Sequence, residues 1–240
     1  MNRNEIFSIV DHTLLKQTAT FEQIRQLCDE AIEFGAASVC IPPCYVKQAS
    51  EYVQGKMTIC TVIGFPHGGH ETAIKVAESA LALDEGCEEL DMVINIGRMI
   101  RGDEDYVRDE IKQIADLAHS RGAIVKVILE TCYLTDAQKK RACELSEEAG
   151  ADFVKTSTGY GSKGCTIDDL RLMRAAVSPA VRVKGSGGIR DLDTVLSARA
   201  VGASRCGVSA TEKIMLEAEK RYAEGTLREV TDLKEMQGGY

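Results

Sequence analysis

Residues 142–156, ACELSEEAGADFVKT, run from a predicted helix into a predicted strand. Apolar residues recur on one face of that helix, at Ala142, Leu145 and Ala149. Gly150 comes next, and glycine is the residue that most often ends a helix in the left-handed conformation. The run 152–155 is short and β-rich, so it predicts a strand that ends at Lys155.

The same order of helix, glycine and strand recurs along the chain. A helical pattern ends and a β-rich run follows after Gly35, Gly86, Gly122, Gly150 and Gly202. Two of the helices begin with a capping-box pattern, T-x-x-Q, at 20–23 and 135–138. This alternation is typical of αβ units whose strands are parallel.

Eight strand candidates result, at 7–13, 37–41, 57–63, 89–94, 124–129, 152–155, 181–185 and 204–207. Their number, at roughly 30 residues per unit, predicts an α/β protein built as a single-domain (β/α)8 TIM barrel. A doubly wound open sheet is the competing architecture, but it usually has a glycine-rich turn after its first strand. Residues 11–15, DHTLL, contain no glycine, so we favour the barrel.

No linker-like or low-complexity stretch divides the chain. We therefore expect one catalytic domain over residues 1–240. The end of the chain, MQGGY at 236–240, is its one loose segment, and we expect a flexible tail there.

The composition excludes several classes of function. With 44% hydrophobic and 28% charged residues it is ordinary for a soluble globular protein, and the net charge of −8 argues against general nucleic-acid binding. No apolar run is long enough to span a membrane, and no signal peptide precedes Asp11. Nine cysteines without a CxxC pair suggest a reducing compartment, so we expect a cytoplasmic protein.

Ionisable residues fall inside or at the end of five predicted strands, at Asp11, Asp91, Lys126, Lys155 and Lys184. In a barrel, catalytic groups come from the carboxyl ends of the strands and the loops that follow. Lysine is rarely buried, so three lysines within apolar strands point to a function.

Lys155 and Lys184 lie on the predicted sixth and seventh strands, which are neighbours in a barrel. Burial lowers the pKa of a lysine, and a second cation nearby lowers it further. A lysine that is partly neutral near pH 7 can attack a carbonyl and form a Schiff base. The alternative is that each lysine points outward and pairs with a carboxylate on a helix.

Asp91 lies inside the apolar strand 89–94, where a carboxylate is costly unless it is paired. The nearby lysines could pair with it, and it could then transfer protons. A purely structural ion pair is the alternative. Lys126, on the fifth predicted strand, could line the same cavity and tune its charge.

Small residues follow the last three predicted strands, and these loops are where barrels most often bind phosphate. The residues concerned are Thr158, Gly159, Ser186, Gly187, Gly188, Gly207 and Ser209. Turns use the same residue types, but their occurrence in the appropriate loops predicts a phosphorylated substrate.

Two further clusters carry less weight. His67 and His70 flank two glycines without the spacing of a metal site, so we predict no metal there. Cys40 and Cys44 flank 41–43 at the end of the second predicted strand, and packing is the simpler role for both.

Several of these segments together resemble the deoxyribose-phosphate aldolase family of class I, Schiff-base aldolases on a (β/α)8 barrel. The resemblance extends along nearly the whole chain, and its most specific segments are KTSTG and KGSGGIR. The segments are 11–15, 38–40, 61–66, 89–97, 126–131, 152–159 and 183–190.

The resemblance implies reversible cleavage of 2-deoxy-D-ribose 5-phosphate to D-glyceraldehyde 3-phosphate and acetaldehyde, in deoxyribose catabolism. It implies that Lys155 forms the Schiff base, that Lys184 depresses the pKa of Lys155, and that Asp91 moves protons. It also implies that Asp11 contacts a substrate hydroxyl and that Tyr240 assists a proton transfer. The resemblance implies no metal and no organic cofactor. It implies a homodimer, with no nucleic-acid or membrane partner.

The chain departs from the family pattern at four places. HGGH at 67–70 replaces a more usual Leu-Gly, Gly185 stands where alanine is commoner, and Tyr160 stands where phenylalanine is commoner. Ser209 is followed by alanine, so this loop offers one hydroxyl where some members offer two. None of these changes removes a catalytic group.

Three other functions remain open from the sequence. The chain could be a Schiff-base aldolase for a different phosphosugar, a catalytically silent phosphosugar-binding barrel, or a metal-dependent barrel enzyme. A binding protein has no need for two neighbouring lysines beside a carboxylate, which argues against the second.

Overall fold

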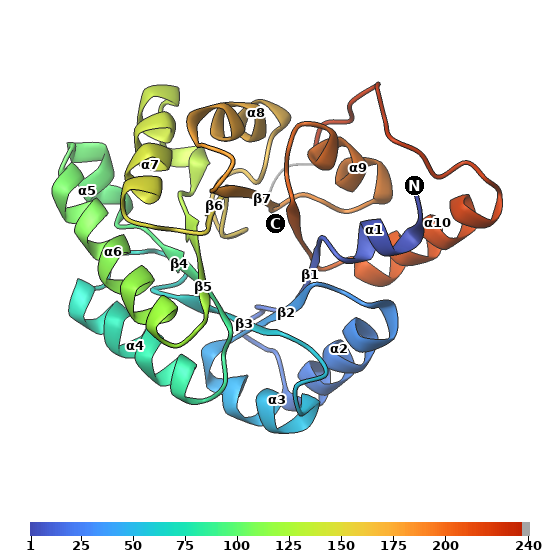
Figure 1. Cartoon of the computed structure of the whole chain (residues 1–240), viewed down its shortest axis with the longest axis horizontal. Coiled ribbons are helices and arrows are strands. Elements are labelled where there is room, and N and C mark those ends of the chain that lie inside the picture. Colours follow the sequence, from blue (N-terminus) through green and yellow to red (C-terminus); the bar gives the residue numbers. More distant parts are fainter. Residues whose placement is uncertain (237–240) are drawn as a thin grey trace.

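The computed structural model describes residues 1–236 and contains a closed barrel of eight strands in chain order, β1-β2-β3-β4-β5-β6-β7-β8 (Figure 1). Each strand pairs in parallel with its two neighbours, and β8 pairs with β1. The strands are β1 (Val10–Thr13), β2 (Ser38–Ile41), β3 (Ile59–Ile63), β4 (Glu89–Val93), β5 (Ile124–Ile128), β6 (Phe153–Lys155), β7 (Arg182–Ser186) and β8 (Arg205–Val208). The predicted barrel is confirmed, and the open sheet is excluded.

Helices cover the outside of the barrel (Figure 1). They are α1 (Arg3–Phe7), α2 (Phe21–Phe34), α3 (Val46–Val53), α4 (Thr72–Asp84), α5 (Ile96–Arg101), α6 (Glu104–Ser120), α7 (Asp136–Glu148), α8 (Ile167–Ala176), α9 (Leu192–Ala200) and α10 (Thr211–Ala223), with short 3-10 turns at Pro43–Tyr45 and Thr131–Tyr133. Within residues 1–236, no helix is long and apolar enough to cross a membrane.

The predicted helix ends are confirmed by the backbone. Both capping boxes form, with Thr20 and Thr135 each accepting the backbone N–H of the glutamine three residues on. The five glycines that were predicted to end helices all have positive φ. The local sequence therefore determines where these helices begin and end.

The first predicted strand, 7–13, begins too early. Residues Arg3–Phe7 form α1, which the side chain of Asn2 caps by accepting the backbone N–H of Glu5. Ile6 and Phe7 are buried, and α1 packs beside α10 (Figure 1). An apolar run of this length fits a strand or one turn of helix equally well, and the contact with α10 decides in favour of the helix.

The apolar core lies mainly between the strands and the surrounding helices. A smaller cluster, Cys40, Cys60 and Val62, is separate from that core, with Leu15 and Phe65 packed against it. The side chains of Asp91, Lys126 and Lys184 are fully buried on three strands of the same barrel. The centre of this barrel is therefore partly ionic, whereas branched apolar residues usually fill such centres.

Candidate active site

Strand pairing brings together the ionisable residues that the sequence singled out. Lys155 and Lys184 are register partners on β6 and β7, and Asp91 and Lys126 are register partners on β4 and β5. Lys155 is the last residue of its strand, whereas Asp91 and Lys184 lie in the middle of theirs. Lys155 is therefore the member of the group that lies closest to the carboxyl ends of the strands, where barrel enzymes bind their substrates.

Asp91 is shared by three ammonium groups. Its Oδ2 lies 2.6 Å from Nζ of Lys155 and 2.7 Å from Nζ of Lys184, and its Oδ1 lies 2.7 Å from Nζ of Lys126. Cys60 also donates to Oδ1, at 3.3 Å. The two lysines predicted to act together thus meet at one carboxylate oxygen, and the outward-pointing alternative is excluded.

Asp11 lies on the other side of Lys184 and is fully buried. Its Oδ2 pairs with Nζ of Lys184, and its Oδ1 accepts from Arg205 at 2.6 Å and from Ser38 at 2.8 Å. Both oxygens are therefore engaged inside the barrel. The predicted contact between Asp11 and a substrate hydroxyl stays a prediction, while the geometry shows Asp11 holding Lys184 and Arg205.

Two residues complete this cluster that the sequence analysis did not single out. Glu89 pairs with Lys126 at 2.6 Å and with Arg205 at 3.2 Å. Glu89 and Arg205 are the first residues of β4 and β8. They therefore lie at the amino ends of their strands, whereas catalytic groups in barrels come from the carboxyl ends. Their charges, each beside an apolar strand run, were the signal that could have identified them.

The cluster is an ionic network of four cations, Lys126, Lys155, Lys184 and Arg205, and three carboxylates, Asp11, Glu89 and Asp91. Burial alone would raise the pKa of Asp91, but Lys126, Lys155 and Lys184 outweigh burial and hold that pKa well below its usual range. The pKa of Asp11 is lowered in the same way, against burial and mainly by Lys184. Both carboxylates are ionised in this arrangement.

Two carboxylates determine the charge of Lys184. Burial alone would lower its pKa, but Asp11 and Asp91 outweigh burial and raise the pKa above the ordinary lysine value. The pKa of Lys126 is also raised, against burial and mainly by Asp91. Lys184 is therefore a cation beside Lys155, and its effect on the pKa of Lys155 stays a prediction.

Glu130 is a further buried carboxylate that the sequence analysis did not single out. It lies two residues after the end of β5 and has a left-handed backbone, with φ of 54°, which is uncommon outside glycine. Its side chain accepts the backbone N–H of Thr158 at 3.2 Å and also the Thr158 hydroxyl. Burial raises the pKa of Glu130. A carboxylate directly after a strand was the signal in the sequence, and Glu130 now links the loops after β5 and β6.

The loops predicted to bind phosphate after β6 and β7 lie side by side. The backbone N–H of Cys165 donates to the carbonyls of Ser186 and Gly187, at 3.1 and 3.0 Å. The Ser186 hydroxyl donates to the Ser157 carbonyl at 2.5 Å. A Cβ at Gly164 would collide with the Gly187 carbonyl, so this close approach requires glycine.

Gly207 brings the eighth strand to the same place, since it is the register partner of Ser186. Gly159, Gly187 and Gly188 all have positive φ. The hydroxyls of Thr158 and Ser186 are donated within the protein, to Glu130 and Ser157. The loops are assembled as predicted, and phosphate binding by them stays a prediction.

Tyr240 and residues 237–239 lie outside the described residues, so the predicted tail and the role of Tyr240 stay predictions. Among residues 1–236, one group of three potential metal ligands is close together, Cys40, Cys60 and Asp91, with ligand atoms within 4.8 Å of one another. Three ammonium groups already contact Asp91, and they would repel a metal ion there. His67 and His70 do not belong to this group.

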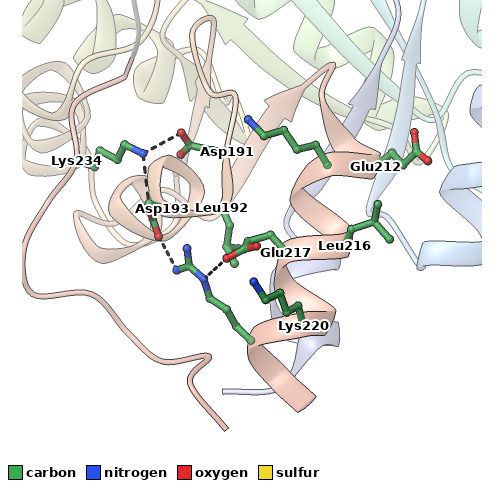
Figure 2. A pocket seen from close by; sticks show the side chains of 10 residues that line it. Asp191, Leu192, Asp193, Glu212, Leu216, Glu217, Lys220 and Lys234 are labelled. Atoms are coloured by element: carbon green, nitrogen blue, oxygen red, sulfur yellow. Dashed lines mark hydrogen bonds and ion pairs between the residues drawn. The ribbon is translucent and has the colours of Figure 1, made fainter. Parts of the chain in front are cut away.

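Hollows occur both at the barrel mouth and on its outer surface. A hollow of about 610 Å³ lies outside the barrel between α9, α10 and Lys234, and Figure 2 shows ion pairs crossing it. Its lining contains none of the buried cluster. Two other hollows lie among loops at the mouth. Cys44 lines the one of about 260 Å³, and Ser209 lines the one of about 300 Å³. The mouth is therefore the entrance nearest to the loops predicted to bind a substrate.

Comparison with known proteins identifies similar sequences and structures. A family model described as DeoC/LacD family aldolase matches residues 6–216. The chain is 50% identical over 218 residues to the deoxyribose-phosphate aldolase of Thermococcus kodakarensis, which covers 90% of this chain and 97% of that protein. It is 48% identical over 219 residues to the deoxyribose-phosphate aldolase of Rhodopirellula baltica, with 91% of each chain covered. A tetrameric deoxyribose phosphate aldolase from Aeropyrum pernix has a similar structure, with a TM-score of 0.86, 34% identity, and 92% of this chain and 93% of that one covered.

Proposed function

The chain belongs to the DeoC/LacD family of aldolases, and on that basis we propose that it is a deoxyribose-phosphate aldolase of the Schiff-base class. It cleaves 2-deoxy-D-ribose 5-phosphate reversibly to D-glyceraldehyde 3-phosphate and acetaldehyde. The observation that carries the site assignment is the meeting of Lys155 and Lys184 at Oδ2 of Asp91, at 2.6 and 2.7 Å. This arrangement supplies a nucleophilic amine, a proton acceptor and a cation at one point.

Lys155 is the nucleophile in this mechanism. It transfers a proton to Asp91, and its Nζ lone pair then attacks C1 of the ring-opened sugar. The C1 oxygen leaves as water, and a protonated imine joins C1 to Lys155. Lys155 fits this role because it lies closest of the three lysines to the carboxyl ends of the strands.

The imine then draws electrons from the bond that breaks. Acetaldehyde carries two carbons, so this bond is C2–C3. The hydroxyl on C3 gives its proton to Lys184, which has passed its own to the departing C1 oxygen, and becomes the aldehyde of glyceraldehyde 3-phosphate. The electron pair of C2–C3 forms an enamine on Lys155. Asp91 then returns the proton it took from Lys155 to C2, and addition of water to the imine releases acetaldehyde and restores the protonated amine.

Lys184 and Asp91 support these proton transfers. Lys184 remains a cation because Asp11 and Asp91 raise its pKa, so it can hold a proton for the departing C1 oxygen. Lys126, paired with Glu89 and Asp91, fixes the other oxygen of Asp91. Lys126 and Asp11 are thus positioning residues in this proposal.

The loops after β6, β7 and β8 bind the phosphate in this proposal. Thr158 and Ser186 donate their hydroxyls within the protein, so backbone N–H groups at Gly159, Gly187 and Gly188 are the principal donors. Ser209 supplies one hydroxyl from the next loop. No metal ion takes part, and EDTA is expected to leave turnover unchanged.

The test is borohydride reduction of the full chain in the presence of acetaldehyde, followed by peptide mass mapping. An ethyl adduct on Lys155 is expected. An adduct on Lys126 or Lys184 would retain the Schiff-base class and overturn the site. The absence of any adduct in folded protein would favour a silent binding barrel or a metal-dependent enzyme, and loss of turnover in EDTA would select the metal-dependent enzyme.

We also propose that the enzyme acts in the cytoplasm as a homodimer. All nine cysteines lie within residues 1–236 and none forms a disulfide, as a reducing compartment favours. Light scattering on the full chain is expected to give twice the chain mass of 26.1 kDa. The Aeropyrum pernix relative is described as a tetramer, and a tetramer mass here would replace the dimer. Recovery of the protein from a membrane or periplasmic fraction would contradict the cytoplasmic assignment.

A further inference from the structure

One aromatic side chain spans the barrel mouth. The hydroxyl of Tyr160, in the loop after β6, donates to the backbone carbonyl of Leu15, in the loop after β1, at 2.7 Å. The Tyr160 ring also meets the Phe65 ring edge-on, with centroids 5.5 Å apart and planes at 90°. Phe65 lies in the loop after β3, so one side chain joins three loops.

The residues that Tyr160 contacts cover the reactive cluster. Leu15 and Phe65 pack against the small apolar cluster that contains Cys60. Cys60 in turn donates to Asp91 at 3.3 Å, and Lys155 is only 3% exposed. Tyr160 therefore contacts two residues that pack against the apolar cluster next to Asp91.

Tyr160 and Leu15 also form a wall between the two hollows at the mouth. The hollow of about 300 Å³ includes Thr13 and Ser209, and the hollow of about 260 Å³ includes Cys44 and Phe65. Tyr160 and Leu15 line both hollows. Lys16 and Gln17 also line both, so the two hollows adjoin along the loop after β1 and the Tyr160 side chain.

Tyr160 is continuous with a loop that contacts phosphate in the proposed function. It directly follows Gly159, and its backbone N–H donates to the Thr158 hydroxyl oxygen at 2.9 Å. Glu130 holds Thr158 from the other side. An anion bound at Gly159 therefore acts on the segment that carries the Tyr160 ring.

We propose that the hydrogen bond from Tyr160 to Leu15 latches the barrel mouth, and that Tyr160 thereby limits how readily a sugar substrate reaches Lys155. This inference rests on the proposed aldolase function. The apparent affinity of a ligand is reduced by the fraction of the protein that is in the state able to bind it. Phosphorylated and unphosphorylated sugars both need the open mouth, so the latch lowers the apparent affinity for both by the same factor.

The test compares Tyr160→Phe with wild type on two substrates, 2-deoxyribose 5-phosphate and 2-deoxyribose. The variant retains the ring against Phe65 and loses only the hydroxyl. The value of kcat/KM is expected to rise about two- to tenfold for both sugars, the range that one net hydrogen bond supplies. The rise is expected to come mainly from a lower KM. Tyr222→Phe, on the exposed face of α10, is the matched control and is expected to keep the wild-type kcat/KM for both sugars.

Two further measurements keep the inference testable. Tyr160→Leu also loses the edge contact with Phe65, so its kcat/KM is expected to rise at least as far. Both Tyr160 variants are expected to trap acetaldehyde on Lys155 with borohydride faster than wild type at low acetaldehyde concentration. Wild-type kcat/KM values for both sugars in both folded variants would overturn the latch. A wild type that cleaves neither sugar would overturn the proposed function instead, and equal trapping rates in that case would overturn the latch as well.

Discussion

Lys184 illustrates at the scale of one residue how buried partners decide the state of a charge. Burial and a neighbouring lysine would by themselves lower its pKa. The side chain instead contacts Asp91 at 2.7 Å and also pairs with Asp11, and these carboxylates raise its pKa. A cation held in this way is suited to keeping Asp91 ionised and to donating a proton, and not to nucleophilic attack.

We predict that Lys184→Leu loses turnover by at least about 100-fold and also loses stability, by about 3–5 kcal/mol, because two buried carboxylates lose their shared cation. The measurements are kcat for 2-deoxyribose 5-phosphate and the free energy of unfolding in urea. Lys75→Leu is the matched control, because Lys75 is equally buried and pairs with Glu110 at 2.9 Å outside this cluster. The control is expected to lose stability while the folded protein keeps its activity. Near-normal turnover in Lys184→Leu would contradict the proton-transfer role.

At the scale of elements, helix ends follow from short local patterns. The capping box of α7 forms as the sequence predicts, with the Thr135 side chain accepting the backbone N–H of Gln138 and the Gln138 side chain accepting that of Thr135. Such a cap satisfies N–H groups that have no partner within the helix. It acts through neighbours in sequence, so the rest of the fold is not needed to predict it.

We predict that Thr135→Ala lowers the free energy of unfolding by about 1 kcal/mol, the usual contribution of an N-cap side chain. Aldolase activity is expected to remain at the wild-type level, since Thr135 is exposed and lies outside the charged cluster. Thr135→Ser, which retains the hydroxyl, is the control and is expected to keep most of the stability. Equal losses in the two variants would show that the cap is not the cause.

One buried histidine joins three elements. His12 of β1 contacts the Thr211 hydroxyl of α10 through Nδ1 at 2.7 Å and Glu30 of α2 through Nε2 at 2.8 Å. Burial lowers the pKa of His12 from 6.5, and this outweighs the opposing effect of Glu30. The folded state therefore favours the neutral ring, which clamps both helices to the first strand.

We predict a loss of stability through His12 as the medium becomes acidic. Because the pKa of His12 is lower in the folded than in the unfolded state, the unfolded chain binds a proton first, and the stabilisation disappears as pH falls through 6.5 towards the folded pKa. Urea unfolding between about pH 7.5 and 5.5 is expected to show this decline in wild type and a shallower one in His12→Gln. Identical slopes in the two proteins would contradict the prediction.

The local sequence patterns did not predict all of the helices. Residues 3–7 were expected to lead into a strand and form α1, and the sequence analysis did not single out α3, α5 or α10. The helices α1, α3 and α5 are short and bury few residues, so their apolar periodicity is weak over one or two turns. The helix α10 has 13 residues, and its buried Ile214, Met215 and Ala218 were the signal that could have identified it. Packing against longer elements, as α1 packs against α10, determines these segments.

At the scale of the whole molecule, barrel closure assembles the active site. Asp11, Asp91, Lys155 and Lys184 come from β1, β4, β6 and β7, and only a closed ring of strands allows them to meet at the centre. Glu89 and Arg205, the first residues of β4 and β8, also belong to this network and pair with each other across the same interior. Function in this protein therefore depends on closure of the complete ring.

We predict that residues 1–240 unfold as one cooperative unit, as a single domain should. Because the ionic network crosses from β1 to β8, opening any part of the ring exposes buried charge. Calorimetry at neutral pH is expected to show one transition with equal calorimetric and van't Hoff enthalpies. Two resolved transitions, or different midpoints for fluorescence and circular dichroism, would contradict the single-domain prediction.

The sequence by itself determined the fold class and most of the site's membership. Helix faces, capping boxes and terminal glycines are local, so they predicted αβ units, and charged residues within apolar strands were conspicuous enough to identify Asp91, Lys155 and Lys184. The tertiary structure alone decided which groups share a charge. It revealed Glu89 and Arg205 as members of the ionic network, Glu130 as the partner of Thr158, and two carboxylates that raise the pKa of Lys184. Electrostatic energies depend on distances of a few ångströms between residues far apart in sequence, which the sequence does not give.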